Sequence, residues 1–362
     1  MRRFQVTAES GSYPVVVGRG AWRELRSLQS RDYSSTFVLT EKGIWQHWGD
    51  RLTRQGGLGR ARVLFVPAGE RSKSLTVLER VSSSLALLGA DRRSLLILFG
   101  GGVIGDLGGF VASTYMRGIH FVQVPTTLLG QVDSAIGGKN AVNLPAGKNL
   151  VGTFYPPRLV LADPRVLASL SPRVFRSGLY EVVKHAILAG DPLVGLLDRH
   201  LDFLRADSVK DLEALLGPAI KVKIDVVNRD EREAKLRQVL NLGHTFGHAL
   251  EAATGYKRFL HGESVGWGLL AITVLAERLG HLQPEDAERM RDLVWRIGAL
   301  PSIRHLPART IVSLLPHDKK AIGGEIHWVI PERIGKVRIV TGVPSNAASS
   351  AWRELQQMPH RR

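Results

Sequence analysis

Short apolar runs alternate with amphipathic stretches from the start of the chain to about residue 165. The apolar runs have the length and composition of buried β-strands. They lie at residues 13–17, 36–39, 62–66, 95–99, 121–124 and 159–161. Between them, residues 43–54 and 75–88 carry apolar positions at helical spacing. This alternation predicts a mostly parallel sheet covered on both faces, which would bind ligands at the carboxyl ends of its strands.

The pattern changes after Pro164. From about Ser171 nearly to Leu315 the apolar positions recur at helical spacing, which predicts a second, α-helical domain. Residues 317–337 predict a short hairpin after these helices. We therefore expect an α/β protein with two domains, residues 1–165 and 166–362, and a chain of 362 residues is long enough for both.

Composition restricts the chemistry that this chain can perform. There is no cysteine, so there is no disulfide, no thiolate ligand and no cysteine nucleophile. Any metal ion must therefore be held by histidine and carboxylate side chains. The lack of cysteine fits a cytoplasmic protein, and the start MRRFQVTAES lacks the apolar segment of a signal peptide. No apolar run is long enough to span a bilayer, so we expect no membrane partner.

The charge balance allows two kinds of partner. The 49 basic and 33 acidic residues give a formal net charge of +16, and a basic protein can bind nucleic acid. The basic residues are scattered, however, and form no run with interleaved aromatic residues. We therefore expect no nucleic-acid partner, and we interpret part of the charge as a means of binding an anionic small molecule.

A glycine-rich turn lies in residues 95–109, LLILFGGGVIGDLGG. Gly100, Gly102 and Gly105 fit the G-x-G-x-x-G pattern, in which a helix N-terminus attracts a pyrophosphate. The match is weak on its own, because no acidic residue closes a second strand about twenty residues later. A tight strand–helix turn without a ligand is the alternative. Asp106, in the first helical turn, would cap the helix or contact a ribose or a nicotinamide amide.

Glycines and polar side chains also alternate in residues 114–157. Lys139 follows two glycines, and Lys148 and Asn149 follow another. Lysines on glycine-rich loops suit phosphate or carboxylate groups, and Asp133 would orient a lysine or a substrate hydroxyl. A long solvated loop is the alternative, although loops of this length without a function are uncommon.

Two further pairs of charged residues match no specific motif of a functional site. Glu70 and Lys73 follow a predicted strand, where a loop would hold an adenosine ribose, but the residues alone favour a solvated turn. Glu181 and Lys184 are three residues apart on a predicted helix, and without further context they predict a surface ion pair.

The stretch EAKLRQVLNLGHTFGHALE, residues 233–251, predicts a helix with chemistry on one face. His244 and His248 are four residues apart, so they would lie one turn apart on the same side. The remaining members of this stripe are Arg237 and Asn241. With His261 from the following segment LHGES, two histidines of one helix and a third nearby are a common beginning of a metal site. Two buried histidines satisfied by hydrogen bonds are the alternative.

Taken together, these motifs resemble the 3-dehydroquinate synthase family, within the sugar phosphate cyclases. The resemblance covers roughly residues 36–336 and depends on several ordered motifs. They are GGGVIGDLGGF, YMRGI, VPTTLLGQVDSAIGGKNAVN, GKNLVGTFYPP, EVVKHAIL, LRQVLNLGHTFGHALE, HGESV and DKK. The resemblance implies a Rossmann-like NAD-binding α/β domain followed by an α-helical metal-binding domain, and a homodimer in which Arg117 reaches the partner subunit's site.

The family pattern also implies a role for individual residues. A divalent metal ion, usually zinc with cobalt possible, would be held by Glu181, His244 and His261, which leaves His248 an acid–base role. The other implied catalytic residues are Glu233, Lys139, Arg237 and Asn241. The implied NAD contacts are Glu70, Lys73, Gly101, Gly102, Val103, Asp106, Thr126, Thr127, Lys139, Lys148 and Asn149. The implied substrate contacts are Arg117, Asp133, Lys139, Lys148, Lys184, Lys223, Arg237, Asn241, His248 and one of Lys319 and Lys320.

The implied reaction converts 3-deoxy-D-arabino-heptulosonate 7-phosphate to 3-dehydroquinate and phosphate, in the shikimate pathway. An alcohol is oxidised by NAD, phosphate is eliminated, the hydride returns, and the ring recloses by an aldol step. Other sugar phosphate cyclases and a metal-dependent alcohol or glycerol dehydrogenase are the alternatives. Two positions depart from the family pattern, Tyr180 where a small residue is usual and Lys235 where glycine is usual. Neither removes a functional group, so they bear on local packing.

Overall fold

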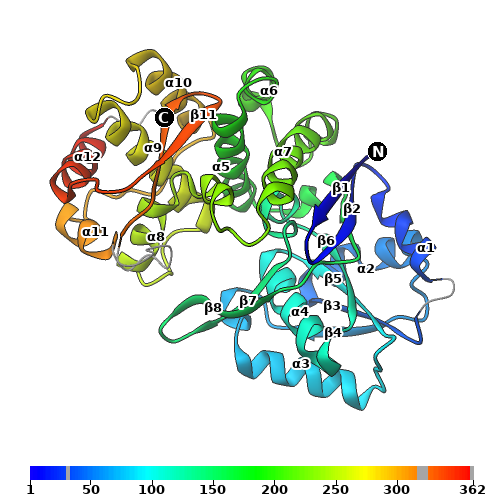
Figure 1. Cartoon of the computed structure of the whole chain (residues 1–362). Helices are drawn as coiled ribbons and strands as arrows, with labels where there is room; N and C mark the ends of the chain where they lie inside the picture. The colour runs from blue at the N-terminus through cyan, green and yellow to red at the C-terminus, as the bar shows by residue number, and fades with distance from the viewer. Residues whose placement is uncertain (30–32, 316–324, 359–362) are drawn as a thin grey trace. The chain divides into compact units, whose positions relative to one another are not determined.

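The computed structural model of this chain describes residues 1–29, 33–315 and 325–358 (Figure 1). The contacts of the chain divide it into two compact units. The first contains Met1–Leu170 and Ala206–Arg232, and the second contains Ser171–Arg205 and Glu233–Arg362. The α/β fold class is confirmed, whereas the division into domains at residue 165 stays a prediction. The helix α7 (Val209–Arg229) belongs by its contacts to the first unit.

The first unit is built on a seven-stranded sheet with the order β1-β2-β9-β6-β5-β3-β4. The strands are β1 (Arg2–Ala8), β2 (Gly11–Val17), β3 (Thr36–Glu41), β4 (Arg62–Val66), β5 (Leu95–Gly100), β6 (His120–Pro125) and β9 (Leu159–Ala162). Strand β1 pairs antiparallel with β2, and every other neighbour in this sheet is parallel. All six predicted strands are confirmed. Strand β1 was not predicted, because it is a largely exposed edge strand without an apolar run.

Both faces of the sheet are covered, as the side chains of β5 show. Successive side chains of a strand point to opposite faces. Leu96 and Leu98 join the core formed with α3 (Leu75–Leu87) and α4 (Gly102–Thr114). Phe99 points the other way and packs edge-on against Trp22, with ring centroids 5.5 Å apart. Trp22 lies in the 3₁₀ helix η1 (Ala21–Glu24) and packs in turn against Trp48 of α2 (Lys42–Gly56). The helices α1 (Leu25–Gln29) and η5 (Pro164–Ser169) complete this part of the unit.

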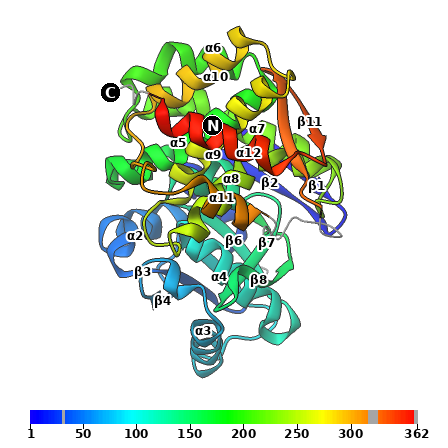
Figure 2. The same cartoon turned by 90° about the vertical axis from the view of Figure 1, so that its left-hand side faces the viewer.

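The expected long loop is largely ordered. It contains the 3₁₀ turn η3 (Tyr115–Arg117), β6, the π-helical turn η4 (Gly130–Ser134) and a hairpin of β7 (Lys139–Leu144) and β8 (Gly147–Phe154). The hairpin lies beside α4 in both views (Figures 1 and 2). The approach is close because Gly109 of α4 has no side chain, and a Cβ there would lie 1.8 Å from Oδ1 of Asn140.

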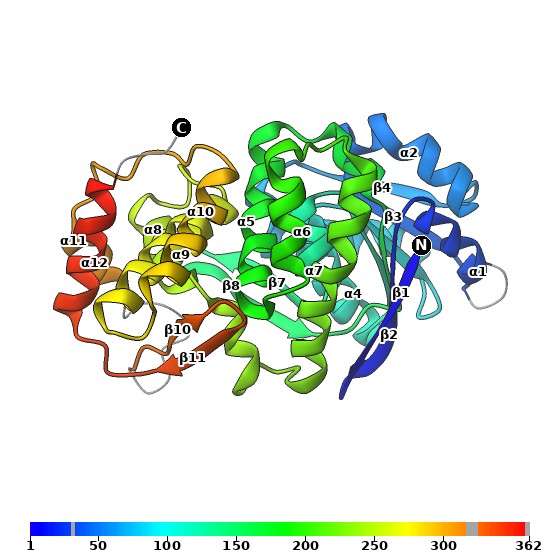
Figure 3. The same ribbon diagram turned by 90° about the horizontal axis from the view of Figure 1, so that it is seen from above.

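The second unit is mainly helical, as expected. Its elements are α5 (Pro172–Ala189), α6 (Leu193–His200), η6 (Leu201–Phe203), η7 (Leu236–Asn241), α8 (His244–Ala253), α9 (His261–Arg278), α10 (Pro284–Arg296), α11 (Ala308–Leu314), α12 (Ser345–Gln357) and the hairpin β10 (Trp328–Arg333) and β11 (Lys336–Val340). Helix α9 is its core: residues 262–276 are all buried, and the helix contacts α5, α8, α10 and α12. Figure 3 shows α8 and α10 beside it.

The prediction of one continuous helix over residues 233–251 is wrong. The 3₁₀ helix η7 ends at Asn241, and α8 begins at His244 after a break. The cause is Gly243, whose φ of 79° belongs to the left-handed region that interrupts a right-handed helix. His244 therefore occupies the first turn of α8, and Arg237 and Asn241 do not continue its stripe.

Within the described residues, no helix is both long enough and apolar enough to cross a membrane.

The crossing of α8 and α9 depends on Gly268. A Cβ at this position would lie 1.8 Å from the carbonyl oxygen of Gly243, a backbone atom that no side-chain rotation can move. We therefore expect Gly268→Ala to lower the free energy of unfolding by about 3 kcal/mol. Gly43→Ala is the matched control, because Gly43 lies in α2 with nothing within 4 Å of a Cβ. Urea unfolding of both variants tests this, and unfolding of Gly268→Ala at the unchanged midpoint would contradict it.

Candidate active site

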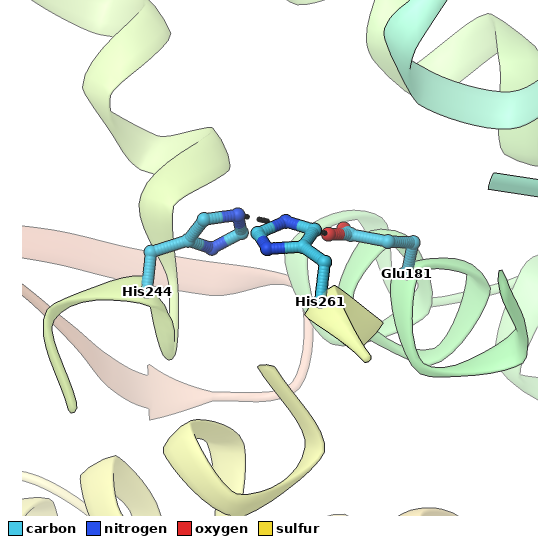
Figure 4. A group of neighbouring side chains, drawn as sticks. All are labelled: Glu181, His244 and His261. Carbon is cyan, nitrogen blue, oxygen red and sulfur yellow. Dashed lines mark ion pairs between the residues drawn. The ribbon is translucent and has the colours of Figure 1, made fainter. Parts of the chain in front are cut away.

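The second unit brings together Glu181 of α5, His244 of α8 and His261 of α9, whose side chains point toward one another (Figure 4). Oε1 of Glu181 lies 3.6 Å from Nε2 of His244 and 3.5 Å from Nε2 of His261. Glu181 is fully buried, and the His244 side chain is 9% exposed. One potential ligand atom from each of the three residues lies within 4.8 Å of the others.

These separations suit a metal ion better than hydrogen bonds. They exceed the 2.7–3.2 Å typical of an N–H···O bond. Two ligands of a tetrahedral zinc ion, each at about 2.0–2.1 Å from the metal, are about 3.3 Å apart. The three side chains therefore nearly have the spacing of a zinc coordination sphere. The donor set, two imidazole nitrogens and one carboxylate, is also one that divalent zinc or cobalt accepts.

Glu181 and Lys184 form a buried pair, so the prediction of a surface ion pair is wrong. Nζ of Lys184 lies 2.6 Å from Oε2 of Glu181, and the two side chains are 1% and 0% exposed. Removing either charge would leave the other buried without its partner, at a cost of several kcal/mol. The pair also orients the carboxylate, because Oε2 is engaged by Lys184 while Oε1 faces the two imidazoles.

The other two members of the predicted histidine group have distinct surroundings. The His248 ring packs edge-on against His244, with centroids 5.4 Å apart, and lies 6.2 Å from the ring of His261. Burial works against the charged form of His261, but Glu181 and Glu251 outweigh it and raise its pKa to about 10. Three histidines and two carboxylates thus share one small region of the second unit.

The position of His261 is set by three contacts between α5 and the start of α9. Arg173, Ser177 and Glu181 are spaced four residues apart, so they follow one face of α5. Nε and Nη2 of Arg173 donate to the Glu263 carboxylate at 2.6 and 2.8 Å. The amide of Gly262 donates to the Ser177 hydroxyl at 3.1 Å. Each turn of α5 therefore holds one successive residue of the α9 N-terminus.

Three predicted site residues lie just before α8. Arg237 of η7 is 2% exposed, which is rare for an arginine unless its charge is paired. Nδ2 of Asn241 donates to Oε1 of Glu233 at 2.7 Å. Glu233 has a φ of 61°, an uncommon conformation for a residue other than glycine. The structure thus brings Glu233 and Asn241 together.

In the first unit, the predicted glycine turn connects β5 to α4. The amides of Gly102, Val103 and Ile104 occupy the first helical turn, where backbone N–H groups have no partner within the helix. A side chain on Gly101 would lie 3.0 Å from the Thr127 methyl group, so the turn is narrow as well as rich in donors. The amide of Thr126 donates to the Gly100 carbonyl at 3.0 Å, which joins the next strand's end to the turn.

Lys73 is the centre of a polar group beside this turn. Lys73 is buried, whereas residues 67–71 before it are exposed, as the residues alone favoured. Its Nζ donates to Asp106 and to Asn149, both at 2.5 Å, and lies 3.8 Å from Glu70. Burial raises the pKa of Asp106, and Lys73 acts in the opposite direction. Four of the predicted cofactor contacts, which are separate in the sequence, are therefore neighbours in space.

The predicted anion-binding residues have different surroundings. Asp133 of η4 accepts a hydrogen bond from Lys223 of α7 at 2.5 Å, both within the first unit. Lys139 and Lys148 lie on the β7–β8 hairpin. Arg117 is exposed with a φ of 67°. Lys319 and Lys320 lie outside the described residues.

Sequence analysis missed two polar residues of the first unit. Asn143 holds two parts of the Lys73 group, because its Nδ2 donates to Glu70 at 2.8 Å and its Oδ1 accepts from the Asn149 amide at 2.9 Å. Glu41 ends β3, at the sheet edge where such folds bind ligands, and burial raises its pKa. The position of Glu41 after a predicted strand was an available signal, whereas nothing local marked Asn143.

Comparison with known proteins decides the family. The family model described as "3-dehydroquinate synthase N-terminal" matches residues 63–177, and "3-dehydroquinate synthase C-terminal" matches residues 178–321. A relative from Solibacter usitatus (strain Ellin6076), 3-dehydroquinate synthase, is 39% identical over 353 residues, which cover 98% of this chain and 99% of the relative. The chain belongs to the 3-dehydroquinate synthase family. The resemblance found in the motifs is confirmed.

Two solved structures of other enzymes show the same fold. One is 2-deoxy-scyllo-inosose synthase complexed with carbaglucose-6-phosphate, NAD⁺ and Co²⁺, with a TM-score of 0.87 and 27% identity over 98% of this chain and 99% of that one. The other is ValA, 2-epi-5-epi-valiolone synthase from Streptomyces hygroscopicus subsp. jinggangensis 5008, with NAD⁺ and Zn²⁺ bound. Its TM-score is 0.85, with 27% identity over 97% of this chain and 99% of that one.

The two departures from the family pattern differ in how the structure accommodates them. Tyr180 is 1% exposed, and its ring occupies the space that a Cβ on Gly266 would enter, 2.7 Å from the ring. Its hydroxyl donates to the Gly298 carbonyl at 3.2 Å. Gly266 thus makes room for a large side chain directly before Glu181. Lys235 precedes η7 with a φ of −147°, so this position does not require glycine.

Proposed function

We propose that this chain is a 3-dehydroquinate synthase that converts 3-deoxy-D-arabino-heptulosonate 7-phosphate to 3-dehydroquinate and phosphate. Membership of the family supports the reaction. The observation that carries the chemistry is the Oε1 atom of Glu181, which faces the Nε2 atoms of two histidines at 3.5–3.6 Å. An enzyme that must first oxidise a secondary alcohol benefits from a cation at such a position.

Glu181, His244 and His261 are proposed to hold a zinc ion, with cobalt as an alternative. When bound, this ion lowers the pKa of a substrate hydroxyl and so favours its oxidation. Two related enzymes were solved with Co²⁺ and Zn²⁺, which supports this choice of metal. Lys184 engages Oε2 of Glu181, so that Oε1 is directed at the histidines.

NAD is proposed to bind in the first unit, at the turn that begins α4. The amides of that turn have no partner within the helix and suit a pyrophosphate. The remaining contacts are assigned to Glu70, Lys73, Gly101, Gly102, Val103, Asp106, Thr126, Thr127, Lys139, Lys148 and Asn149. NAD supplies a hydride acceptor that is regenerated within each turnover. The solved relatives that contain NAD⁺ support this cofactor.

Proton transfer is assigned to His248 and Glu233. His248 lies against the ring of His244, so it is close to the proposed metal without being part of its ligand set. Glu233 is oriented by the amide of Asn241. The proposal is supported by residue type, because imidazole and carboxylate groups are the usual carriers of protons in general acid–base catalysis.

The substrate carries both a carboxylate and a phosphate, and the remaining basic side chains are assigned to them. Each charge-assisted hydrogen bond contributes about 1.5–3 kcal/mol. The assigned substrate contacts are Arg117, Asp133, Lys139, Lys148, Lys184, Lys223, Arg237, Asn241, His248 and one of Lys319 and Lys320. An alcohol dehydrogenase acting on an uncharged substrate would not need so many lysine and arginine side chains to bind it.

We further propose a cytoplasmic homodimer in which Arg117 completes the partner's site. Met116 and Arg117 both adopt positive φ, at 50° and 67°. Such conformations cost on the order of 1–3 kcal/mol each for residues other than glycine, and they concentrate at functional sites. An exposed arginine held in this way is suited to a ligand of another chain.

Loss of the metal ligands tests the zinc site. His244→Ala and His261→Ala are expected to reduce bound zinc from about one ion per chain to nearly none, because a site of three ligands loses its chelation. His47→Ala is the control, because His47 is an exposed histidine of the first unit. Mass spectrometry measures the metal content of each variant after dialysis. Full retention of zinc in both histidine variants would refute this ligand set.

The reaction is expected to be redox-neutral. The hydride taken by NAD returns before product leaves, so phosphate should accumulate over many turnovers while reduced-nicotinamide absorbance stays at or below one equivalent per site. Phosphate release and absorbance are recorded together with the heptulosonate phosphate as substrate. Stoichiometric release of NADH into solution would instead establish a dehydrogenase. Turnover of another sugar phosphate in preference to this one would establish a different cyclase.

Mixed dimers test the role of Arg117. Arg117→Ala and Lys139→Ala are each expected to be nearly inactive, but a hybrid of the two retains one intact site if Arg117 acts in the partner. Equal mixing with free chain exchange should restore on the order of one quarter of the activity. Lys139→Ala mixed with Asp133→Ala is the control, because both residues act in their own chain and no site is restored. Absence of recovery despite proven exchange would exclude a shared site.

A further inference from the structure

His261 lies between two buried carboxylates, one on each ring nitrogen. Nε2 is 3.5 Å from Oε1 of Glu181, and Nδ1 is 3.6 Å from Oε1 of Glu251. The Glu251 side chain is 4% exposed. The contacts of Arg173 and Ser177 with the start of α9 hold the backbone next to this ring. The backbone that carries this ring is therefore held against α5.

A neutral imidazole carries a single proton, and its place decides which nitrogen can bind a metal. If Nε2 of His261 is the ligand, the proton must be on Nδ1, and Nδ1–H then needs an acceptor. An ionised carboxylate only accepts hydrogen bonds, so Glu251 favours this tautomer over the other. Carboxylates in this relation to a metal-bound histidine orient the ring and raise the basicity of its ligand nitrogen.

We infer that Glu251 is a positioning residue, which holds His261 with its proton on Nδ1 and leaves Nε2 available to the metal. This rests on the metal site proposed above. The present separation of 3.6 Å exceeds a formed N–H···O bond by about 0.7 Å, and a small rotation of either side chain closes that gap. The proposed contact is one between side chains, so the backbone need not move.

The position of Glu251 in the fold explains how it reaches a residue of another helix. It lies three residues after His248 and seven after His244, so the three share one face of α8. Helix α9 crosses α8 closely there: a Cβ on Gly247 would lie 3.0 Å from the Ser264 carbonyl oxygen. Helix α8 thus supplies one proposed ligand directly and orients a second one across the crossing.

A direct ligand role for Glu251 is the competing possibility. His248, Glu251 and His261 form a second group whose potential ligand atoms lie within 4.8 Å of one another. In that arrangement His261 would bind through Nδ1 and Glu251 would be indispensable. A positioning residue, by contrast, changes metal affinity without removing a ligand, so the two roles predict different degrees of loss.

The experiment compares Glu251→Gln and Glu251→Ala with the unchanged full-length protein. Zinc affinity is measured by competition with a chromophoric chelator, and the visible spectrum of the cobalt-loaded protein reports the ligand set. We expect a zinc dissociation constant raised about 10–100-fold in Glu251→Ala and less in Glu251→Gln, which keeps an acceptor oxygen. The cobalt bands should keep their intensity, because the number of ligands is unchanged. Thermal unfolding of the metal-free variants shows whether each is folded.

Two controls separate the possible failures. Glu277→Gln removes a carboxylate from the far end of α9, where Glu277 pairs with Arg291, and should bind zinc like the unchanged protein. His261→Ala tests the proposed site itself. Loss of zinc in His261→Ala together with unchanged affinity in both Glu251 variants would overturn this inference alone. Normal zinc binding by His261→Ala would overturn the proposed site.

One further result would replace the inference. If Glu251→Ala removed zinc as completely as His261→Ala, with loss of the cobalt bands, while His244→Ala retained it, Glu251 would be a ligand. A graded loss with intact cobalt bands supports the positioning role.

Discussion

The chemistry of the second unit depends on how closely three helices approach one another. Gly262 and Gly268 of α9 face backbone carbonyls of Ser177 and Gly243, and a Cβ at either glycine would lie 1.8 Å from the opposing oxygen. Only glycine permits such contacts. Because α9 begins at His261, these contacts also decide where its first side chain lies. The close packing of the helix backbones therefore brings Glu181, His244 and His261 together.

Buried charge is the second recurring feature, and it occurs in both units. Lys184 with Glu181 and Lys73 with Asp106 are close pairs in which each lysine is nearly inaccessible. The cost of removing two charges from water can equal or exceed their attraction, so such pairs are poor evidence of a contribution to stability. They are better explained by function. A lysine that fixes a carboxylate gives it a defined direction, which a metal or cofactor site requires.

The proposed role of Glu251 extends the same argument beyond the residues assigned to the metal. A ligand histidine can present either nitrogen, and burial alone does not choose between them. In the inferred arrangement Glu251 makes the choice, because it accepts the one proton on Nδ1 and leaves Nε2 to the metal. Glu181, Lys184, His261 and Glu251 thereby form a continuous series of contacts through which each group orients the next.

Local pattern determined much of the fold. Six strands, the helices of both parts and the glycine turn follow from apolar runs and helical periodicity, because these report burial directly. Strand β1 has no apolar run, and the β7–β8 hairpin is only partly buried, so neither shows the pattern of a buried strand. The predicted helix over residues 233–251 was wrong because the φ of Gly243 depends on its packing against α9.

Family motifs in the sequence named Glu181, His244 and His261, but only the tertiary structure brought them within ligand distance. It also showed that Glu181 and Lys184 are buried, that Lys73 joins Asp106 to Asn149, and that Asn143 and Glu251 belong beside them. The physical reason is that chemistry depends on residue type, which is read along the chain. Distance, burial and the direction of a hydrogen bond arise between segments remote in sequence, and these exist only once the chain has folded.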